Sequence, residues 1–563
     1  MKLFALAVFL GVASAKNLKW ETYKPKDVDA TKYIITAAKL NTGQSHETRV
    51  VRFSRGHPSA HIFLLPPAPG QGAKYWESEV EKLRAVYGED FVLYAVDLRG
   101  TTNGTPFFDE SSGNWNSLDE DLKSQSGKLS ISSLNVSGMA SDLERLVNRV
   151  KDDPGFAGKV YLHARSFGAL IAKKVLESSD KTYSAVVFES SLVPGSWTHI
   201  QNDSSFLKLC ESDDFCRHQF NGMSPLQMRN AVASIGSPGY NECSTALMET
   251  LKKESIGLLP SDASDWVRVQ EFLQPFFQGK IQIGDYHSAM ITLPFLSATY
   301  LCPSVDTYKK DILPKMIKFV KDAKNPFSRY TTFGSEVDIN RFANAYLMMY
   351  EVFNMGLEKD HPCQGAAPLG LASPCILYKY YHKYIKQFKK ILGKHSHDYS
   401  SVKNSNTKMF FIGGALDLVT PLSTTSEFHD KSTGMEKRLL KFQNLGHHPL
   451  NKGACAREIG REILGKAGSG DTDACMKRAN AEKLDWKMPK ISYISSWWSG
   501  KELAPSTTVP PKVDVDDGKS KTKALYYVAL VVGIVAVLAV TGHVCYTLYT
   551  RRKARNDDTY SVA

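Results

Sequence analysis

The sequence predicts an α/β fold with a buried parallel sheet, and three observations predict it. Short apolar runs of strand length alternate with helical stretches between residues 61 and 188. The runs are nearly continuous in apolar residues, which is typical of strands that are covered on both faces. The same rhythm returns after residue 405. Together these features favour layers of helix packed on one sheet.

The elements follow one another in a regular succession. The apolar run at residues 61–65 leads into a loop rich in Pro and Gly at 66–72, and the run at 91–96 ends at Asp97. Turn residues in these positions indicate strand ends. We expect strands at residues 61–65, 91–96, 159–163, 184–188, 408–412 and 438–442, and helices at 141–151 and 167–178.

Residues 192–405 interrupt this succession. They contain Pro- and Cys-rich segments and long aromatic helical stretches, such as residues 340–355 and 376–392. Because strands resume at residue 408, we expect 192–405 to be an inserted, mostly helical lid. Residues 16–191 and 406–500 would then form the two parts of one core.

Both ends of the chain carry targeting signals. Residues 1–15 combine an early Lys, a short apolar run and a small-residue cleavage site, which predicts a signal peptide. Residues 524–549 are long and apolar enough to span a bilayer. The Pro- and Ser-rich residues 501–523 predict a disordered stalk, and the Arg and Lys within residues 550–563 predict a cytosolic tail. The expected protein is therefore a single-pass type I membrane protein whose main domain is extracellular or lumenal.

The cysteines fit an oxidising compartment. Of the nine, Cys545 lies in the expected membrane span, and the remainder is an even number outside it. We expect up to four disulfides, with Cys210/Cys216 and Cys363/Cys375 as candidate local pairs. Their spacings match no zinc motif, so we expect no metal and no other cofactor.

Surface chemistry points away from nucleic acid. Glycosylation sequons begin at Asn103, Asn135 and Asn202, as expected of a lumenal surface. The formal net charge is +12, but part of it is the basic cluster of the tail and the rest is scattered. Basic and aromatic residues do not alternate, so we expect a solvated surface and no nucleic-acid partner.

The sharpest local motif is Ala-Arg-Ser-Phe-Gly at residues 164–168, between an expected strand and an expected helix. A serine hydroxyl becomes a useful nucleophile when a tight turn holds it next to a base. Small residues two before and two after the serine let such a turn close. We therefore expect Ser166 to be a catalytic nucleophile; the bland alternative is a helix N-cap.

Two further residues complete a triad in chain order. Asp417 follows the strand at 408–412, and His447 follows the strand at 438–442. Serine, aspartate and histidine in this order, each after a strand, are typical of an α/β-hydrolase. His448 is a rival for the base, and we prefer His447 because it directly follows Gly446. Structural roles, an Asx turn for the aspartate and a core position for the histidine, are the alternatives.

An oxyanion hole needs two backbone donors. The N–H of Phe167, the residue after the nucleophile, is the first, and the second should come from the loop at 66–72. Pro67 and Pro69 have no N–H, which leaves Ala68 as the first choice and Gly70 as the second.

A family resemblance rests on five motifs. Residues 65–72, 97–101, 140–145, 164–168 and 414–421 resemble, in order, the motifs of the prolyl- and tripeptidyl-aminopeptidase family of α/β-hydrolase serine peptidases. In that family the loop after the early strand usually reads His-Gly-Gly-Pro-Gly, and here Pro66, Pro67 and Ala68 replace its first three residues. The resemblance implies release of residues or short peptides from a free N-terminus, with access restricted by a lid. It also implies that Asp97 and Arg99 are structural.

The expected function is therefore a membrane-anchored serine exopeptidase that acts through an acyl-enzyme on peptides with a free N-terminus. An esterase or lipase of the same fold is the alternative within this chemistry, since the fold does not choose between amide and ester. A catalytically silent adhesion or receptor ectodomain is the alternative from another class. An aminopeptidase also needs a carboxylate for the substrate ammonium; many acidic residues of 192–405, and Glu189 at its edge, are candidates.

Overall fold

The computed structural model describes most of residues 18–104, 133–193 and 401–482, with pieces of 208–214, 241–253 and 298–322 and the residues Leu347 and Glu351. These residues all belong to one compact unit, Met1–Ile491. The expected signal peptide, stalk, membrane span and cytosolic tail lie outside the described residues. Within the described part, no helix has the length and apolar character needed to cross a membrane.

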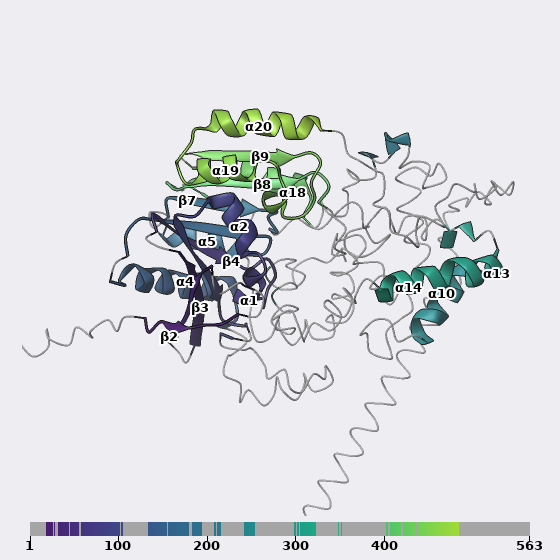
Figure 1. Ribbon diagram of the computed structural model, residues 1–563, viewed down its shortest axis with the longest axis horizontal. Helices are drawn as coiled ribbons and strands as arrows, with labels where there is room; N and C mark the ends of the chain where they lie inside the picture. Colours follow the sequence, from purple (N-terminus) through teal and green to yellow (C-terminus); the bar gives the residue numbers. More distant parts are fainter. Residues whose placement is uncertain are drawn as a thin grey trace, which may run out of the picture. The chain divides into compact units, whose positions relative to one another are not determined.

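A nine-stranded sheet forms the centre of the described part (Figure 1). Its strand order is β1-β2-β3-β5-β4-β6-β7-β8-β9. The pairs from β1 to β5 along this order are antiparallel, and every pair from β5 to β9 is parallel. The strands are β1 (Glu21–Thr22), β2 (Ile34–Gly43), β3 (His46–Ser54), β4 (Ala60–Leu65), β5 (Phe91–Asp97), β6 (Lys159–Arg165), β7 (Ala185–Glu189), β8 (Lys408–Gly414) and β9 (Lys437–Phe442).

All six expected strands are present, as β4 to β9. Every residue of β4, β5 and β7 is buried, which explains why these strands read as continuous apolar runs. Within β5, alternate side chains serve the two faces: Tyr94 joins one hydrophobic cluster and Leu93 joins the other. The predicted α/β fold with a buried sheet is therefore confirmed, with an antiparallel edge added by β1 to β3.

Helices cover both faces of the sheet. Those of one face contribute to the cluster that contains Tyr94, and those of the other to the cluster that contains Leu93. On the first face lie α4 (Val136–Lys151), α5 (Gly168–Ser179) and α18 (Leu422–Lys431), and on the second α1 (Ala73–Glu77), α2 (Val80–Tyr87), α19 (Ala456–Ile463) and α20 (Ser469–Ala481).

The helix expected at residues 141–151 begins earlier, at Val136. Asn135 caps it, because its side-chain oxygen accepts a hydrogen bond from the Gly138 N–H at 2.7 Å. A side chain at Gly138 would collide with the Arg99 guanidinium, 2.6 Å from the position of an added Cβ. The helix expected at 167–178 is present as α5.

The segment between β7 and β8 leaves the sheet and returns to it. Glu189 of β7 pairs in parallel with Ile412 of β8, so the two parts of the core share one sheet. The described pieces of this segment are helical, and the helices expected at 340–355 and 376–392 lie outside the described residues apart from Leu347 and Glu351. The pieces are α10 (Glu242–Lys253), α13 (Val305–Thr307), the π-helix Tyr308–Ile312 and α14 (Leu313–Asp322).

Two disulfides occur among the described residues. Cys243 is bonded to Cys302, and Cys455 to Cys475. The candidate local pairs Cys210/Cys216 and Cys363/Cys375 lie outside the described residues. The expectation of disulfides is confirmed for these two pairs.

Candidate active site

Ser166 occupies a tight turn between β6 and α5. Its φ is +44°, in the left-handed region that side chains other than glycine seldom adopt. Its backbone N–H donates to the Glu189 carbonyl at 2.9 Å, and the residue is 4% exposed. An added Cβ at Gly168 would lie 2.9 Å from the Leu65 Cβ, so the turn requires glycine there. The strand, strained serine and helix are those of a nucleophile elbow.

Asp417 and His447 form a hydrogen-bonded pair. Nδ1 of His447 lies 2.9 Å from Oδ2 of Asp417, and the carboxylate also accepts the N–H and the hydroxyl of Thr420, both at 2.8 Å. Asp417 is 1% exposed. Burial alone would raise its pKa, but the facing His447 and the donors of Thr420 outweigh burial and lower it. Asp417 therefore stays ionised and orients the imidazole.

The loops that carry this pair are built against each other. The N–H of Leu416 donates to the Leu445 carbonyl at 3.0 Å. A Cβ at Gly414 would lie 2.2 Å from the same carbonyl oxygen, so only glycine allows this approach. Parallel pairing of β8 with β9 brings both strand ends to one edge of the sheet.

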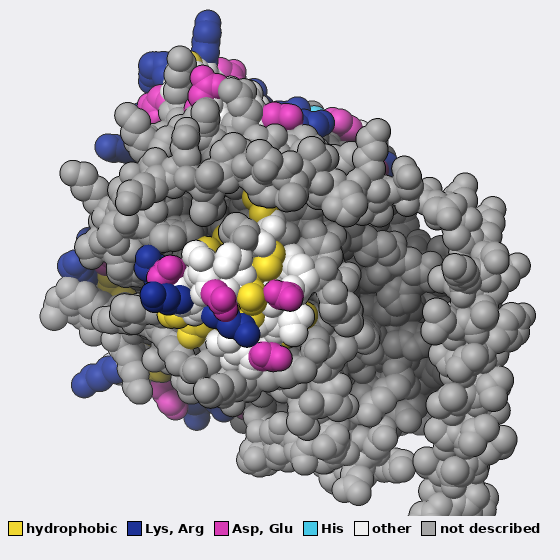
Figure 2. Space-filling model, turned by 90° about the vertical axis from the view of Figure 1, so that its right-hand side faces the viewer, with side chains coloured by type: hydrophobic (Ala, Val, Ile, Leu, Met, Phe, Trp, Pro, Cys, Tyr) yellow, Lys and Arg dark blue, Asp and Glu magenta, His cyan; other side chains and the backbone are white. Residues whose placement is uncertain are grey.

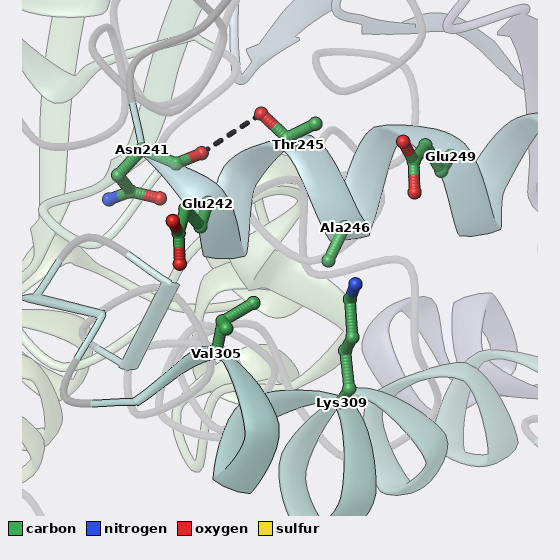
Figure 3. A pocket seen from close by; sticks show the side chains of 7 residues that line it. All are labelled: Asn241, Glu242, Thr245, Ala246, Glu249, Val305 and Lys309. Carbon is green, nitrogen blue, oxygen red and sulfur yellow. Dashed lines mark hydrogen bonds between the residues drawn. The ribbon is translucent and has the colours of Figure 1, made fainter.

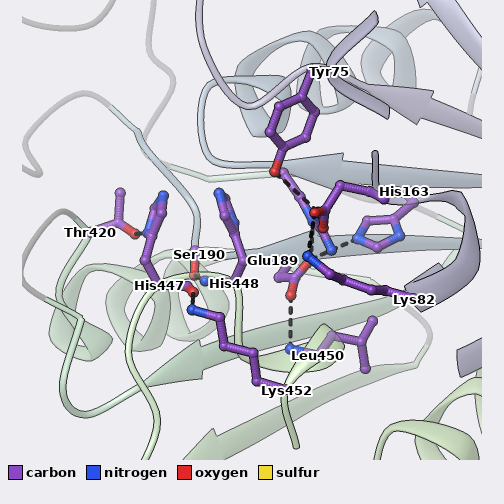
Figure 4. Close-up of polar contacts among 12 residues, drawn as sticks. Tyr75, Lys82, His163, Glu189, Ser190, Thr420, His447, His448, Leu450 and Lys452 are labelled. Carbon is purple, nitrogen blue, oxygen red and sulfur yellow. Dashed lines mark hydrogen bonds and ion pairs between the residues drawn. The ribbon is translucent and has the colours of Figure 1, made fainter. Parts of the chain in front are cut away.

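The structure distinguishes the two adjacent histidines. Asp417 contacts His447, while the His448 ring lies against the His447 ring, tilted by 43° with centroids 3.8 Å apart (Figure 4). The His448 backbone is left-handed, with φ +57°, and its N–H donates to Ser190 Oγ at 3.0 Å. Burial and then the neighbouring His447 lower the pKa of His448 well below its usual range. The histidine that faces the Asp417 carboxylate is thus His447, the residue preferred from the sequence.

Ser166 lies at the same edge of the sheet as the Asp417–His447 pair. Arg165, its predecessor, pairs with Glu189 on β7, and Glu189 pairs with Ile412 on β8. Among the described residues no hydrogen bond joins the Ser166 hydroxyl to His447. Catalytic contacts of this kind are often long before substrate binds.

The two predicted oxyanion donors, Phe167 and Ala68, lie on turns that contact each other. The Phe167 N–H does not face an empty site: it donates to the Pro67 carbonyl at 3.1 Å. The Ala68 carbonyl in turn accepts from the Gln71 N–H at 3.2 Å. The Pro67 carbonyl therefore occupies the position in front of the Phe167 N–H that a substrate oxygen would need.

A buried polar network behind Ser166 was not predicted from the sequence. Its centre is Glu189, whose carboxylate contacts Arg165, His163 and the Leu450 backbone (Figure 4). Glu189 is 0% exposed, and its partners are donors. The expectation that Glu189 could bind a substrate ammonium is therefore wrong. The only sequence signal was an acidic residue at the end of an apolar strand.

Asp97 and Arg99 have the structural contacts that the resemblance implies. Asp97 accepts the Ala73 N–H at 2.7 Å and pairs with Arg49 at 3.1 Å. Arg99 binds both oxygens of Asp142, at 2.6 and 2.7 Å. These pairs join β5 to β3, to α1 and to α4.

The described part contains two of the three sequon asparagines. Asn103 and Asn135 are both partly exposed, and Asn202 lies outside the described residues. Asn135 uses its oxygen to cap α4, and its nitrogen is the atom that would carry a glycan.

A cavity of about 500 Å³ lies between α10 and the segment at 305–309 (Figure 3). Glu242, Glu249 and Lys309 supply its charged lining. Figure 2, which views this side of the molecule, shows acidic and basic side chains intermixed around hydrophobic ones. In the described ranges no cluster of His, Cys, Asp and Glu has the geometry of a metal site.

Comparisons with known proteins return structures but no family. No family model matches the chain, and no curated protein matches it. A proline iminopeptidase from Mycobacterium smegmatis is 12% identical, with 78% of this chain and 99% of that chain covered and a TM-score of 0.31. An esterase from Exiguobacterium antarcticum is 11% identical, covering 76% and 96%, with a TM-score of 0.27. An epoxide hydrolase from Vigna radiata is 14% identical, covering 78% and 98%, with a TM-score of 0.32.

Structural similarity with TM-scores of 0.27, 0.31 and 0.32 is too low to support a fold or a function. The fold assignment therefore rests on the chain's own features. The parallel sheet with its antiparallel edge, the strained turn at Ser166 and the Asp417–His447 pair at the carboxyl edge are the features of one architecture. The chain has the α/β-hydrolase fold.

Proposed function

We propose that this chain is a serine hydrolase that works through an acyl-enzyme. The observation that carries the proposal is the Asp417–His447 hydrogen bond of 2.9 Å at the sheet edge that also holds Ser166 in its strained turn. A buried carboxylate that orients an imidazole beside an elbow serine is the machinery of nucleophilic acyl transfer.

The chemistry assigns one role to each residue. His447 Nε2 takes the proton of Ser166 as Oγ bonds to the substrate carbonyl carbon. The same proton then goes to the leaving amine or alcohol as its bond to carbon breaks. Water repeats the cycle: His447 takes its proton, the acyl bond is hydrolysed, and the proton returns to Oγ. Asp417 fixes the tautomer and stabilises the imidazolium throughout.

Oxyanion stabilisation requires a change in the loop after β4. Rotation of the Pro67–Ala68 peptide would turn the Pro67 carbonyl away from Phe167 and aim the Ala68 N–H into the site. Both predicted donors, Phe167 and Ala68, would then face the oxyanion. The proposal names this peptide because its Pro67 carbonyl accepts the Phe167 N–H in the structure.

The finer proposal is an exopeptidase of the aminopeptidase type, supported by the motif resemblance of residues 65–72, 97–101 and 164–168. Glu189 is buried and its carboxylate already binds donors of the protein, so the carboxylate for the substrate ammonium must come from another acidic residue. The proposed setting is type I in the membrane, with the catalytic domain outside the cytosol, and the disulfides support it.

One experiment tests both levels. Full-length protein in detergent is treated with a fluorophosphonate, beside a Ser166→Ala control, and then profiled on peptide and ester libraries. Labelling of wild type alone, with cleavage next to free N-termini, supports the proposal. Ester turnover without peptide cleavage indicates an esterase, and equal absence of labelling in both proteins indicates a silent ectodomain.

A further inference from the structure

The carboxyl end of β7 contacts two parts of the proposed site. One is the turn at Ser166, here called the nucleophile turn, and the other is the loop that follows β9 and carries His447, here called the base loop. Glu189 accepts the Ser166 N–H through its backbone carbonyl at 2.9 Å. Its side-chain Oε1 accepts the Leu450 N–H at 2.8 Å, three residues after His447. One residue therefore holds both the nucleophile turn and the base loop.

The other carboxylate oxygen of Glu189 accepts hydrogen bonds from two buried side chains, which keeps this carboxyl group ionised. Oε2 of Glu189 accepts Arg165 Nε at 2.6 Å and His163 Nε2 at 2.9 Å. Tyr87 lies 3.0 Å from Nδ1 of His163, so the neutral ring donates to Glu189 and accepts from Tyr87. All these groups are buried, and burial lowers the pKa of His163. The carboxylate thus has fixed donors on both oxygens.

Ser190 adds a second connection one residue later. Its Oγ accepts the His448 N–H at 3.0 Å, and its own N–H donates to the Ile412 carbonyl at 2.8 Å. Its φ is +51°, so Ser166 and Ser190 are both left-handed, at the ends of the paired strands β6 and β7. The base loop is therefore held at two points, at His448 by Ser190 and at Leu450 by Glu189.

These features cost stability. A buried carboxylate must be desolvated, and a left-handed serine is strained. An apolar side chain in place of Glu189 and a glycine in place of a left-handed serine would fill the same space at a lower cost in folding free energy. The arrangement is therefore best explained by the geometry it imposes. A displacement of about 1 Å between base and nucleophile lowers rates roughly 100-fold.

We propose that Glu189 and Ser190 are positioning residues that set the distance between His447 and Ser166. This inference rests on the proposed serine hydrolase function. Glu189 acts through the Ser166 turn and the Leu450 N–H, and Ser190 acts through the His448 N–H. Both residues are fully buried.

The test uses the full-length protein and two variants. Glu189→Gln keeps the size but replaces one acceptor oxygen by a donor. Ser190→Gly removes the hydroxyl and suits the left-handed backbone, so it retains the fold. Glu79→Gln is the matched control, since Glu79 also binds Arg165, at 3.0 Å, from the opposite end of the network, next to α2.

The expected result is a fall in kcat of roughly 10- to 100-fold in both variants, with KM nearly unchanged, when rates are counted per folded molecule. Fluorophosphonate labelling of Ser166 should slow by a similar factor, and Glu79→Gln should react like wild type. Thermal melting gives the folded fraction. If Glu189→Gln does not fold, Ser190→Gly decides.

Two other outcomes are distinguishable. Wild-type labelling and kcat in folded Ser190→Gly and Glu189→Gln would overturn the positioning role and leave the hydrolase proposal intact. Failure of wild type itself to label at Ser166 would overturn both.

Discussion

The backbone N–H of Phe167 donates to the carbonyl of Pro67, with 3.1 Å between nitrogen and oxygen. The proposed oxyanion hole needs this N–H for the substrate, so the loop after β4, in the conformation of this structure, opposes the proposed chemistry. Under the proposed function, catalysis depends on rotation of the peptide that joins Pro67 to Ala68.

Removal of the Ala68 N–H should expose this dependence. Ala68→Pro deletes the donor that rotation would bring into the site. We expect kcat to fall roughly 10²- to 10³-fold, as for loss of one oxyanion donor. Ala68→Gly keeps the N–H and should remain within a few-fold of wild type. Equal kinetics for the two variants would exclude Ala68 as a donor.

Disruption of the Asp417–His447 pair should also lower activity. Asp417→Asn presents an amide to Nδ1 and favours the wrong tautomer of His447, so kcat should fall roughly 10³- to 10⁴-fold. Asp430→Asn, at an exposed carboxylate paired with His429, is the control and should keep full activity. Steady-state kinetics on the same substrate compare the two. A minor effect of Asp417→Asn would contradict the assigned base.

Acid should unfold the protein through its buried carboxylates. The Glu189 pKa, which burial alone would raise, is lowered to about 2 by Arg165 and His163. A depressed carboxylate stabilises the fold above its unfolded pKa and loses that contribution as pH falls toward the folded value. The Glu189 contribution, roughly 3 kcal/mol, should therefore disappear between about pH 4.5 and 2.

His163 extends this dependence to higher pH. Burial lowers its folded pKa, so below about pH 6.5 the unfolded chain binds a proton that the folded chain does not. Stability should fall with pH from that point. Melting temperatures from pH 7 to 2 check both effects, and Glu189→Gln should flatten the curve below pH 4.5. A wild-type curve that is flat down to pH 3 would contradict the buried network.

The disulfide between Cys455 and Cys475 should contribute to stability and not to catalysis. It joins the start of α19 to α20 and closes a loop with a sequence separation of 20. Replacement of both by Ser should lower the free energy of unfolding by about 3 kcal/mol. The folded variant should keep wild-type kcat, since neither residue contacts the triad. Urea titration and kinetics measure the two quantities, and an unchanged urea midpoint would argue against the cross-link.

The sequence predicted the parts of the fold that local pattern encodes. Strands β4 to β8 are almost wholly buried, so each reads largely as an apolar run, whereas β9 is only partly buried. Ser166, Asp417 and His447 each follow one of these strands. The antiparallel edge was not predicted, because β2 mixes residues such as Lys39 and Asn41 with its apolar ones. The start of α4 was placed late because its first turn contains Ser137 and Gly138, which are weak helix formers.

Contacts between distant elements could not be read from the chain. The pairing of Arg165 with Glu189 depends on the register of β6 and β7, and the tie to Leu450 depends on the fold of the base loop. The hydrogen bond from Phe167 to Pro67 is likewise a contact between two turns. Sequence supplied the residue types at these positions, and only the folded backbone brings them together.

The most direct test is the site of covalent labelling by a fluorophosphonate, mapped by peptide mass spectrometry on the full-length protein. The account predicts one adduct, on Ser166, absent in Ser166→Ala and strongly slowed in His447→Gln. No adduct under conditions that label a known serine hydrolase, or an adduct on another residue, would contradict it.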